Sequence, residues 1–176
     1  MRIFFGLDID NDTRRALADW RDRHAVAAGR AVPATNFHVT LAFIGEVDNR
    51  QLDALCRAVD AWEPGPDTGA GAILLDQVGY WPKPGIYWTG PSQAAPELAV
   101  LARKLQHLGG QVGARLETKP FAPHVTLYRG CTQPPPAPAL PPAIRLVYDH
   151  FTLFESQARR QGVSYQVLEH WDLQAG

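Results

Sequence analysis

The spacing of hydrophobic and polar residues predicts a chain in which strands and helices follow one another closely. Side chains alternate between the two faces of a strand, whereas apolar side chains recur every three or four residues on one face of a helix. Strands are predicted over residues 2–8, 36–45, 71–79, 85–89, 124–128, 144–154 and 163–173. Helices are predicted after residues 10–12 and over residues 51–61 and 95–108. The first half therefore has the order strand, helix, strand, helix, which the second half repeats loosely.

Residues that favour helix starts and turns mark the boundaries of these elements. Asp10 is a candidate N-cap of the first helix, and Asp48 with Gln51 three residues later resembles a capping box. Proline lacks a backbone donor, so the proline-rich stretch from Gln133 to Pro142 is predicted to be a loop outside the core. The last two predicted strands form a hairpin that turns within residues 157–162.

Length and composition favour one globular domain over residues 1–176. The hydrophobic fraction of 45% is sufficient for a core. A net charge of -1 argues against a protein that binds long stretches of nucleic-acid backbone. No apolar run approaches the roughly 20 residues that cross a bilayer, and the chain starts with a strand-like pattern rather than a secretory signal. We therefore expect a cytoplasmic protein that does not bind membranes. Cys56 and Cys131 show no paired spacing, and no disulfide is expected.

A repeated tetrapeptide is the strongest chemical signal in the sequence. His-Val-Thr-Leu occurs at residues 38–41 and again at residues 124–127, both times within a predicted strand. Chance would give roughly 0.3 His-x-Thr triplets in a chain with 6 histidines and this threonine content. Two copies that match at all four positions indicate an internally duplicated chain.

Strand geometry gives each copy of the tetrapeptide a polar face and an apolar face. His38 and Thr40 face one side of their strand, as do His124 and Thr126 of theirs, while the valine and leucine of each copy face the other side. If the two halves are related by a pseudo-two-fold axis, two imidazoles and two hydroxyls surround one volume. Such a volume suits a tetrahedral anion.

The residue types indicate acid and base catalysis on a phosphate. Imidazole has an ordinary pKa near ~6.5, so one histidine can take a proton while the other donates one as a cyclic phosphate opens. The threonine hydroxyls can donate to phosphate oxygens, and Arg129 adds a permanently charged donor. Taken alone, each motif is more typical of a strand histidine that forms a structural hydrogen bond. Arg129 alone is more typical of a solvated arginine at the end of a strand. The duplication favours the catalytic interpretation.

Other chemical signatures are missing from the sequence. It contains no HExxH, paired CxxC, glycine-rich phosphate loop or Ser-His-Asp pattern. The remaining histidines, His24, His107, His150 and His170, have no partner at metal-ligand spacing. We therefore expect neither a metal site nor a cofactor, although two histidines with a carboxylate elsewhere in the chain would still be able to bind a metal.

Further segments resemble a known family over nearly the whole chain. They are residues 2–8, 36–37, 43–47, 82–84 with Trp88, 120–123 and 164–168. Together with the two tetrapeptides, these segments are similar to the 2H phosphoesterases, and among them to the bacterial RNA 2′,3′-cyclic phosphodiesterases, also called 2′-5′ RNA ligases or LigT-like proteins.

The resemblance implies an α+β, bilobal fold of two antiparallel sheets with flanking helices, related by a pseudo-two-fold axis, with the active-site cleft between the lobes. It also implies hydrolysis of RNA 2′,3′-cyclic phosphodiester ends to 2′-phosphomonoesters, with 2′-5′ RNA ligation as the reverse reaction. The expected partners are RNA ends or nucleotides that carry such a phosphate, bound by a monomer. By family convention His38 is the proton donor and His124 the proton acceptor, whereas the sequence pattern alone makes the two equivalent.

Substrate contacts beside the second motif are less well defined by the sequence. The family often has a polar residue where Ala122 stands, and Phe121 or the pair Tyr80-Trp81 is suited either to stacking a base or to core packing. Two alternative functions remain open. One is a phosphodiesterase that acts on a small nucleotide, such as an ADP-ribose cyclic phosphate or a 2′-5′ oligonucleotide. The other is a catalytically weak module that binds RNA ends.

Overall fold

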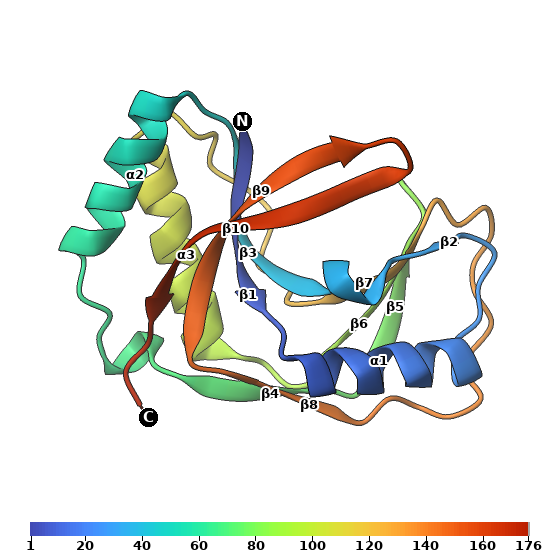
Figure 1. Cartoon of the computed structure of the whole chain (residues 1–176). Helices are drawn as coiled ribbons and strands as arrows, with labels where there is room; N and C mark the ends of the chain where they lie inside the picture. The colour runs from blue at the N-terminus through green and yellow to red at the C-terminus, as the bar shows by residue number, and fades with distance from the viewer. Residues whose placement is uncertain (176) are drawn as a thin grey trace.

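The computed structural model describes residues 1–175, in which strands and helices alternate along the chain (Figure 1). The strands are β1 (Arg2–Asp8), β2 (Arg30–Ala31), β3 (His38–Glu46), β4 (Gly71–Leu75), β5 (Gln77–Trp81), β6 (Ile86–Gly90), β7 (Val125–Arg129), β8 (Ile144–Tyr148), β9 (His150–Arg159) and β10 (Gly162–Asp172). The α-helices are α1 (Asn11–His24), α2 (Asn49–Ala61) and α3 (Pro96–Gly110), and short 3-10 helices are η1 (Ala34–Asn36) and η2 (Pro66–Thr68).

The strands form two four-stranded antiparallel sheets, which confirms the predicted α+β class. The first sheet has the order β10-β9-β1-β3 and the second the order β2-β7-β6-β5. The first sheet contains the beginning and the end of the described chain, and the second is built mainly from its middle. Each sheet contains one copy of the repeated tetrapeptide. The first copy begins β3, and the second begins one residue before β7 and continues into it.

A third, two-stranded sheet formed by β4 and β8 was not predicted. Residues 71–79 and 144–154 were each predicted as a single strand, and each is instead divided between two sheets. The first division falls at Asp76, whose backbone amide donates to the carbonyl of Gly90 and whose carboxylate accepts from the backbone of Ser92. Alternate residues are buried in β4 and in β8, whereas β5 has no fully buried residue and β9 buries consecutive residues from Phe151 to Phe154, so the burial pattern changes at each break.

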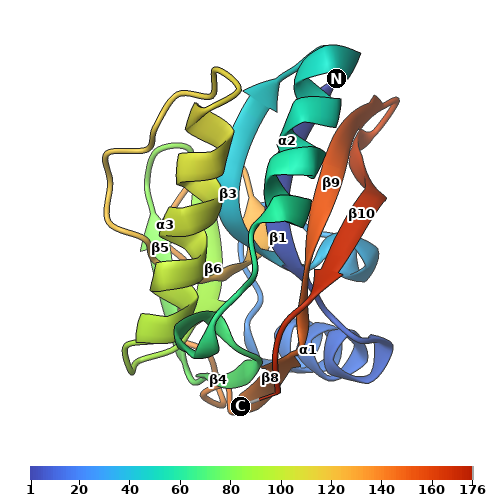
Figure 2. The same ribbon diagram turned by 90° about the vertical axis from the view of Figure 1, so that its left-hand side faces the viewer.

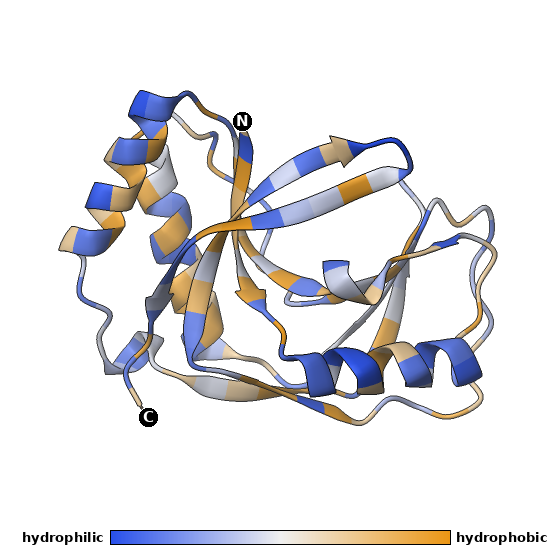
Figure 3. Cartoon of the chain, viewed as in Figure 1, coloured by the Kyte–Doolittle hydropathy of each residue, from blue (hydrophilic) through white to orange (hydrophobic). Residues whose placement is uncertain are grey.

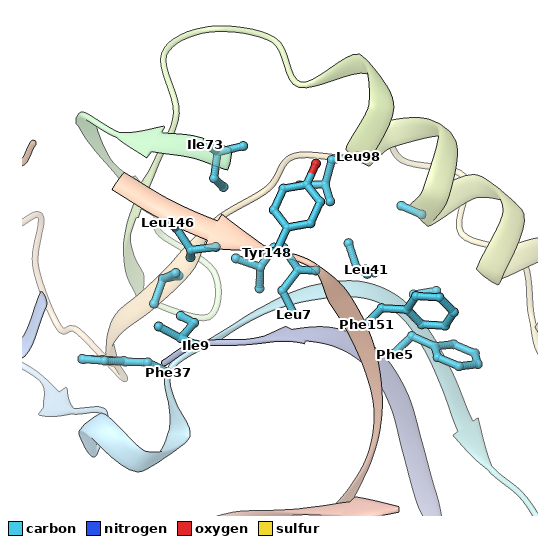
Figure 4. Packing of buried hydrophobic residues seen from close by; sticks show 14 of the residues in the cluster. Phe5, Leu7, Ile9, Phe37, Leu41, Ile73, Leu98, Leu146, Tyr148 and Phe151 are labelled. Atoms are coloured by element: carbon cyan, nitrogen blue, oxygen red, sulfur yellow. The ribbon is translucent and has the colours of Figure 1, made fainter. Parts of the chain in front are cut away.

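Helices α2 and α3 lie side by side against the first sheet (Figures 1 and 2). Helix α3 contacts β3, and Leu98 of this helix is fully buried near Leu41 and Phe151 (Figure 4). The apolar side of β1, with Phe5 and Leu7, belongs to the same core. The helices thus cover the face of the sheet opposite to the polar side of the tetrapeptide. No helix within residues 1–175 is long and apolar enough to span a membrane.

The predicted helix starts are confirmed. The side chain of Asp10 accepts a hydrogen bond from the backbone of Thr13, and Asp48 and Gln51 form the reciprocal bonds of a capping box. Hydrophilic residues cover the outer side of α2 (Figure 3).

Strands β9 and β10 form the predicted hairpin, which extends from the first sheet to a hydrophilic tip (Figure 3). The strands pair up to Arg159 and Gly162, so the turn is tighter than predicted. Residues 133–142 contain no strand or helix, as expected of a proline-rich loop. This loop lies on α1, because the indole of Trp20 donates to the carbonyl of Leu140 and the amide of Ala139 donates to that of His24.

A buried arginine joins α1 to the second sheet. The side chain of Arg21 is 5% exposed, and its Nη1 donates to the carbonyls of Val32 and Leu127. Its guanidinium also lies over the ring of Phe37, 5.1 Å from the centroid. Hydrogen bonds from a charged donor in a buried setting are strong, so Arg21 holds the second motif against the first helix.

We expect Arg21→Met to lower the free energy of unfolding by about 2 kcal/mol, since it removes charged hydrogen bonds and leaves the Leu127 and Val32 carbonyls less well paired. Urea denaturation measures this difference. The matched control is Arg23→Met on the exposed side of the same helix, whose ion pair with Asp19 should contribute under about 0.5 kcal/mol. Equal losses in the two variants would show that Arg21 is not a structural anchor.

Candidate active site

The two copies of the tetrapeptide have the alternating burial that strand geometry requires. His38 is the first residue of β3, and His124 immediately precedes β7. The imidazoles and both threonines, Thr40 and Thr126, are half-buried. The aliphatic side chains of the same motifs are buried in the core, and they are Val39, Leu41, Val125 and Leu127. The predicted separation into a polar and an apolar face is therefore present in both copies.

Each histidine is held by a carbonyl two residues earlier in the chain. Nδ1 of His38 donates to the carbonyl of Asn36 at 2.8 Å, and Nδ1 of His124 donates to that of Ala122 at 2.8 Å. A carbonyl can only accept, so Nδ1 carries the hydrogen in both rings. In the neutral form, Nε2 is therefore the basic nitrogen that each histidine offers to a substrate.

The two halves differ in what surrounds Nε2. In the first half, the Thr40 hydroxyl lies 3.0 Å from Nε2 of His38 and donates to it when the ring is neutral. Within the described residues, His124 forms no corresponding hydrogen bond with Thr126. Without substrate, the Thr40 hydroxyl is thus hydrogen-bonded to Nε2 of His38, whereas Nε2 of His124 forms no such bond with Thr126.

Aromatic rings pack against both imidazoles. The ring centroid of His38 lies 5.0 Å from that of Phe4 and 4.9 Å from that of Tyr165, which meets it edge-on. His124 lies 4.6 Å from Trp81 and 6.2 Å from Trp88. The sequence pattern indicated Trp81 only as one of two candidates for stacking. Phe4 and Tyr165 were missed, because their proximity to His38 depends on the pairing of β1, β9 and β10.

Positive charge gathers around the two histidines. Burial lowers the pKa of His38 to about 4, and the charges of Arg129, His124 and Arg14 act in the same direction, against the hydrogen bond to Asn36. Burial also lowers the pKa of His124, and Arg129 adds to this effect. Arg129 therefore lies within electrostatic range of both imidazoles. Strands β3 and β7 are in contact, so the two motifs lie close together.

Arg14 is a second arginine near the site that the sequence pattern did not indicate. Its Nη2 lies 2.9 Å from the Asp8 carboxylate, and Asp8 is the residue directly opposite His38 in the pairing of β1 with β3. The Nε of Arg14 is buried without a hydrogen-bond partner in the described part of the chain. Its location follows from the ion pair across the short connection between β1 and α1, which places Arg14 near the strand that pairs with β3.

Phe121 lies beside the second motif rather than against an imidazole. It is half-buried, packs on the core and lines a pocket of about 430 Å³ together with Trp88, Ala122 and Pro123. Trp88 also contacts His124, so this pocket adjoins the second histidine. A neighbouring pocket of about 440 Å³ beside β4 is lined by neither motif. In residues 1–175 no three His, Cys, Asp or Glu side chains are grouped as metal ligands would be.

Comparison with known proteins identifies the relatives of this chain. The family model described as LigT like phosphoesterase matches twice, over residues 7–88 and 89–165, and each match contains one copy of the tetrapeptide. The RNA 2′,3′-cyclic phosphodiesterase of Escherichia coli (strain K12) is 34% identical over 98% of this chain and 96% of its own.

Solved structures give the same result for the fold. A crystal structure of a phosphoesterase superposes with a TM-score of 0.89 at 30% identity and covers 99% of this chain and 98% of its own. A crystal structure of E. coli LigT complexed with 3′-AMP superposes with a TM-score of 0.87 at 31% identity, over 98% and 97% of the two chains. The family resemblance and the fold predicted from it are confirmed.

The depressed pKa of His38 predicts a stability that falls with acidification. Because its folded-state pKa of about 4 lies below the ordinary value of 6.5, the unfolded chain takes up the proton first as pH falls. The contribution of His38 to stability is complete above about pH 6.5 and is lost between that value and about pH 4. The free energy of unfolding changes by at most about 1.4 kcal/mol per pH unit for one proton.

Denaturation curves over this pH window test the prediction. His38→Asn, which keeps a side-chain donor, should flatten the slope of stability against pH. His107→Asn removes an exposed imidazole on α3, outside the site, and should keep the wild-type slope. A slope that His38→Asn leaves unchanged would show that burial of this imidazole does not affect acid stability.

Proposed function

Because the chain belongs to the LigT like phosphoesterase family, we propose that it hydrolyses RNA 2′,3′-cyclic phosphodiester ends to 2′-phosphomonoesters. One observation supports this most directly. Two histidines with the same tautomer, each held by the carbonyl two residues earlier, lie beside one arginine whose charge acts on both. The E. coli relative, an RNA 2′,3′-cyclic phosphodiesterase, and the 3′-AMP bound to E. coli LigT support the substrate class.

In the proposed reaction, the two Nε2 atoms lie on opposite sides of the phosphorus. His124 takes a proton from water as the water oxygen bonds to phosphorus, and His38 donates a proton to the ribose 3′ oxygen as its bond to phosphorus breaks. These roles follow the family convention. Free His38 is neutral near pH 7, because its pKa is about 4. The negative charge of a bound phosphate favours the protonated ring and thus prepares the acid.

The other residues of the site hold the phosphate and its nucleoside. Thr40 and Thr126 donate to the non-bridging oxygens, and Arg129 supplies a charged donor that compensates the charge of the phosphate. Phe121 and Trp88 border the pocket that takes the base. An RNA 5′-hydroxyl in place of water gives a 2′-5′ linkage, which accounts for ligation by the same groups. We propose that RNA ends reach this site in a monomer without a metal ion or cofactor.

Purified protein in the presence of a chelator should open a 2′,3′-cyclic phosphate at an RNA end. His38→Ala and His124→Ala should each reduce kcat by about 10²-fold or more, since each removes one proton-transfer group. His107→Ala, at an exposed position outside the site, is the matched control and should retain full activity. Undiminished turnover by both site variants would refute the two-histidine mechanism, and binding without turnover by the wild type would favour an RNA-end binding module.

The position of the phosphate in the product tests the direction of ring opening. Protonation of the 3′ oxygen should leave the phosphate on the 2′ oxygen, so ³¹P NMR should show a 2′-phosphomonoester as the only product. A 3′-phosphomonoester would contradict the proposed arrangement of acid and base. Relative rates on RNA ends, ADP-ribose cyclic phosphate and 2′-5′ oligonucleotides then separate the proposed substrate from the smaller nucleotides.

A further inference from the structure

Asn36 forms hydrogen bonds in two directions. Its backbone carbonyl accepts from Nδ1 of His38 at 2.8 Å, and its side-chain Nδ2 donates to the backbone carbonyl of Val163 at 2.8 Å. Asn36 is the last residue of η1, whereas Val163 lies in β10 at the far end of the sequence. One half-buried side chain thus connects the first histidine to the last strand.

The position of β10 explains why this bond is available. Within residues 1–175, β10 is the outer strand of its sheet and pairs only with β9, so carbonyls on its free edge have no neighbouring strand to pair with there. Asn36 supplies a donor to one of them. Two residues further along β10, the ring of Tyr165 meets His38 edge-on at 4.9 Å. The hairpin therefore contacts His38 directly through Tyr165 and indirectly through Asn36.

These contacts form a closed ring of neighbouring groups. It runs from the Asn36 carbonyl to the His38 imidazole, then to Tyr165, along the backbone to Val163, and through the amide back to Asn36. In a closed ring of this kind, a displacement of the hairpin changes the position of both groups that hold the imidazole, the Asn36 carbonyl and the Tyr165 ring.

The second motif has no equivalent connection. Ala122 occupies the position of Asn36 and holds His124 through its carbonyl alone, and the rings against His124 come from β5 and β6. A carbonyl is therefore sufficient to select the tautomer of a histidine in this fold. The amide of Asn36 must serve a purpose beyond tautomer selection.

We propose that Asn36 is a positioning residue that couples the β9–β10 hairpin to the orientation of His38. The effect on the reaction rests on the proposed phosphodiesterase function, but the coupling itself does not. When the hydrogen bond from the Asn36 side chain to the Val163 carbonyl is lost, the carbonyl of Asn36 and the ring of Tyr165 no longer move together. The imidazole of His38 then samples orientations that do not face the phosphate, at a cost in kcat.

The test uses Asn36→Ala and the similarly shaped Asn36→Leu, neither of which can donate to Val163. In wild-type protein, ¹⁵N chemical shifts should show His38 with hydrogen on Nδ1. Both variants should move these shifts toward those of a freely exchanging imidazole, with His124 unchanged as the internal reference. On an RNA cyclic phosphate, kcat should fall about tenfold while KM stays within about twofold.

Gln157→Ala is the matched control, because it removes another amide from the same hairpin. Its Nε2 donates to Glu155 and Gln166 on the face away from His38, so the variant removes a hairpin amide but keeps the hydrogen bond between Asn36 and Val163, and His38 shifts and kcat should stay unchanged. Unchanged His38 shifts in both Asn36 variants would overturn the proposal, as would equal effects of Gln157→Ala. Inactive wild-type protein would refute the phosphodiesterase function, and the ¹⁵N shifts would still decide the coupling.

Discussion

The burial of two aliphatic side chains beneath each histidine is the constraint on which the site depends. Val39 and Leu41 in one sheet, and Val125 and Leu127 in the other, are enclosed by the core. Because side chains alternate in a strand, this burial leaves the imidazoles no orientation except toward the opposite face. A shift of either strand by one residue would place a histidine in the core and a valine in the site. The core therefore determines the side of each strand to which the imidazoles point.

The pseudo-symmetry that the repeat suggests is broken by the groups around each ring. His38 is enclosed by Phe4 and Tyr165 and bonded to Thr40, whereas His124 lies against two indoles with its Nε2 free of a threonine. Burial and arginine charge also lower the pKa of both rings. An anion relieves this repulsion, so a phosphate is a natural occupant.

The parts of the fold that depend on local spacing were predicted from the sequence, and the parts that depend on distant contacts were not. The strands of both motifs, the capping box at Asp48 and the last hairpin follow from neighbouring residues. The division of residues 71–79 between two sheets does not, because β4 pairs with β8, a strand far away in the sequence, whereas β5 pairs with β6. Likewise, Tyr165 meets His38 only after β10 has joined the sheet, and Arg14 comes near His38 only because its partner Asp8 lies opposite His38 in the pairing of β1 with β3. The spacing of neighbouring residues in the sequence does not predict contacts between distant segments.

The pairing of β1 with β9 has a consequence for protein synthesis. The first strand to leave the ribosome is held on one side by a strand that begins at residue 150, and Tyr165 follows still later. The first histidine thus has β1 and Phe4 beside it early, but it lacks β9, β10 and Tyr165 until nearly the whole chain has been translated. A ribosome that stalls before that point releases a protein whose second motif can be in place but whose first is not. Such truncated products would be inactive toward the RNA that surrounds them.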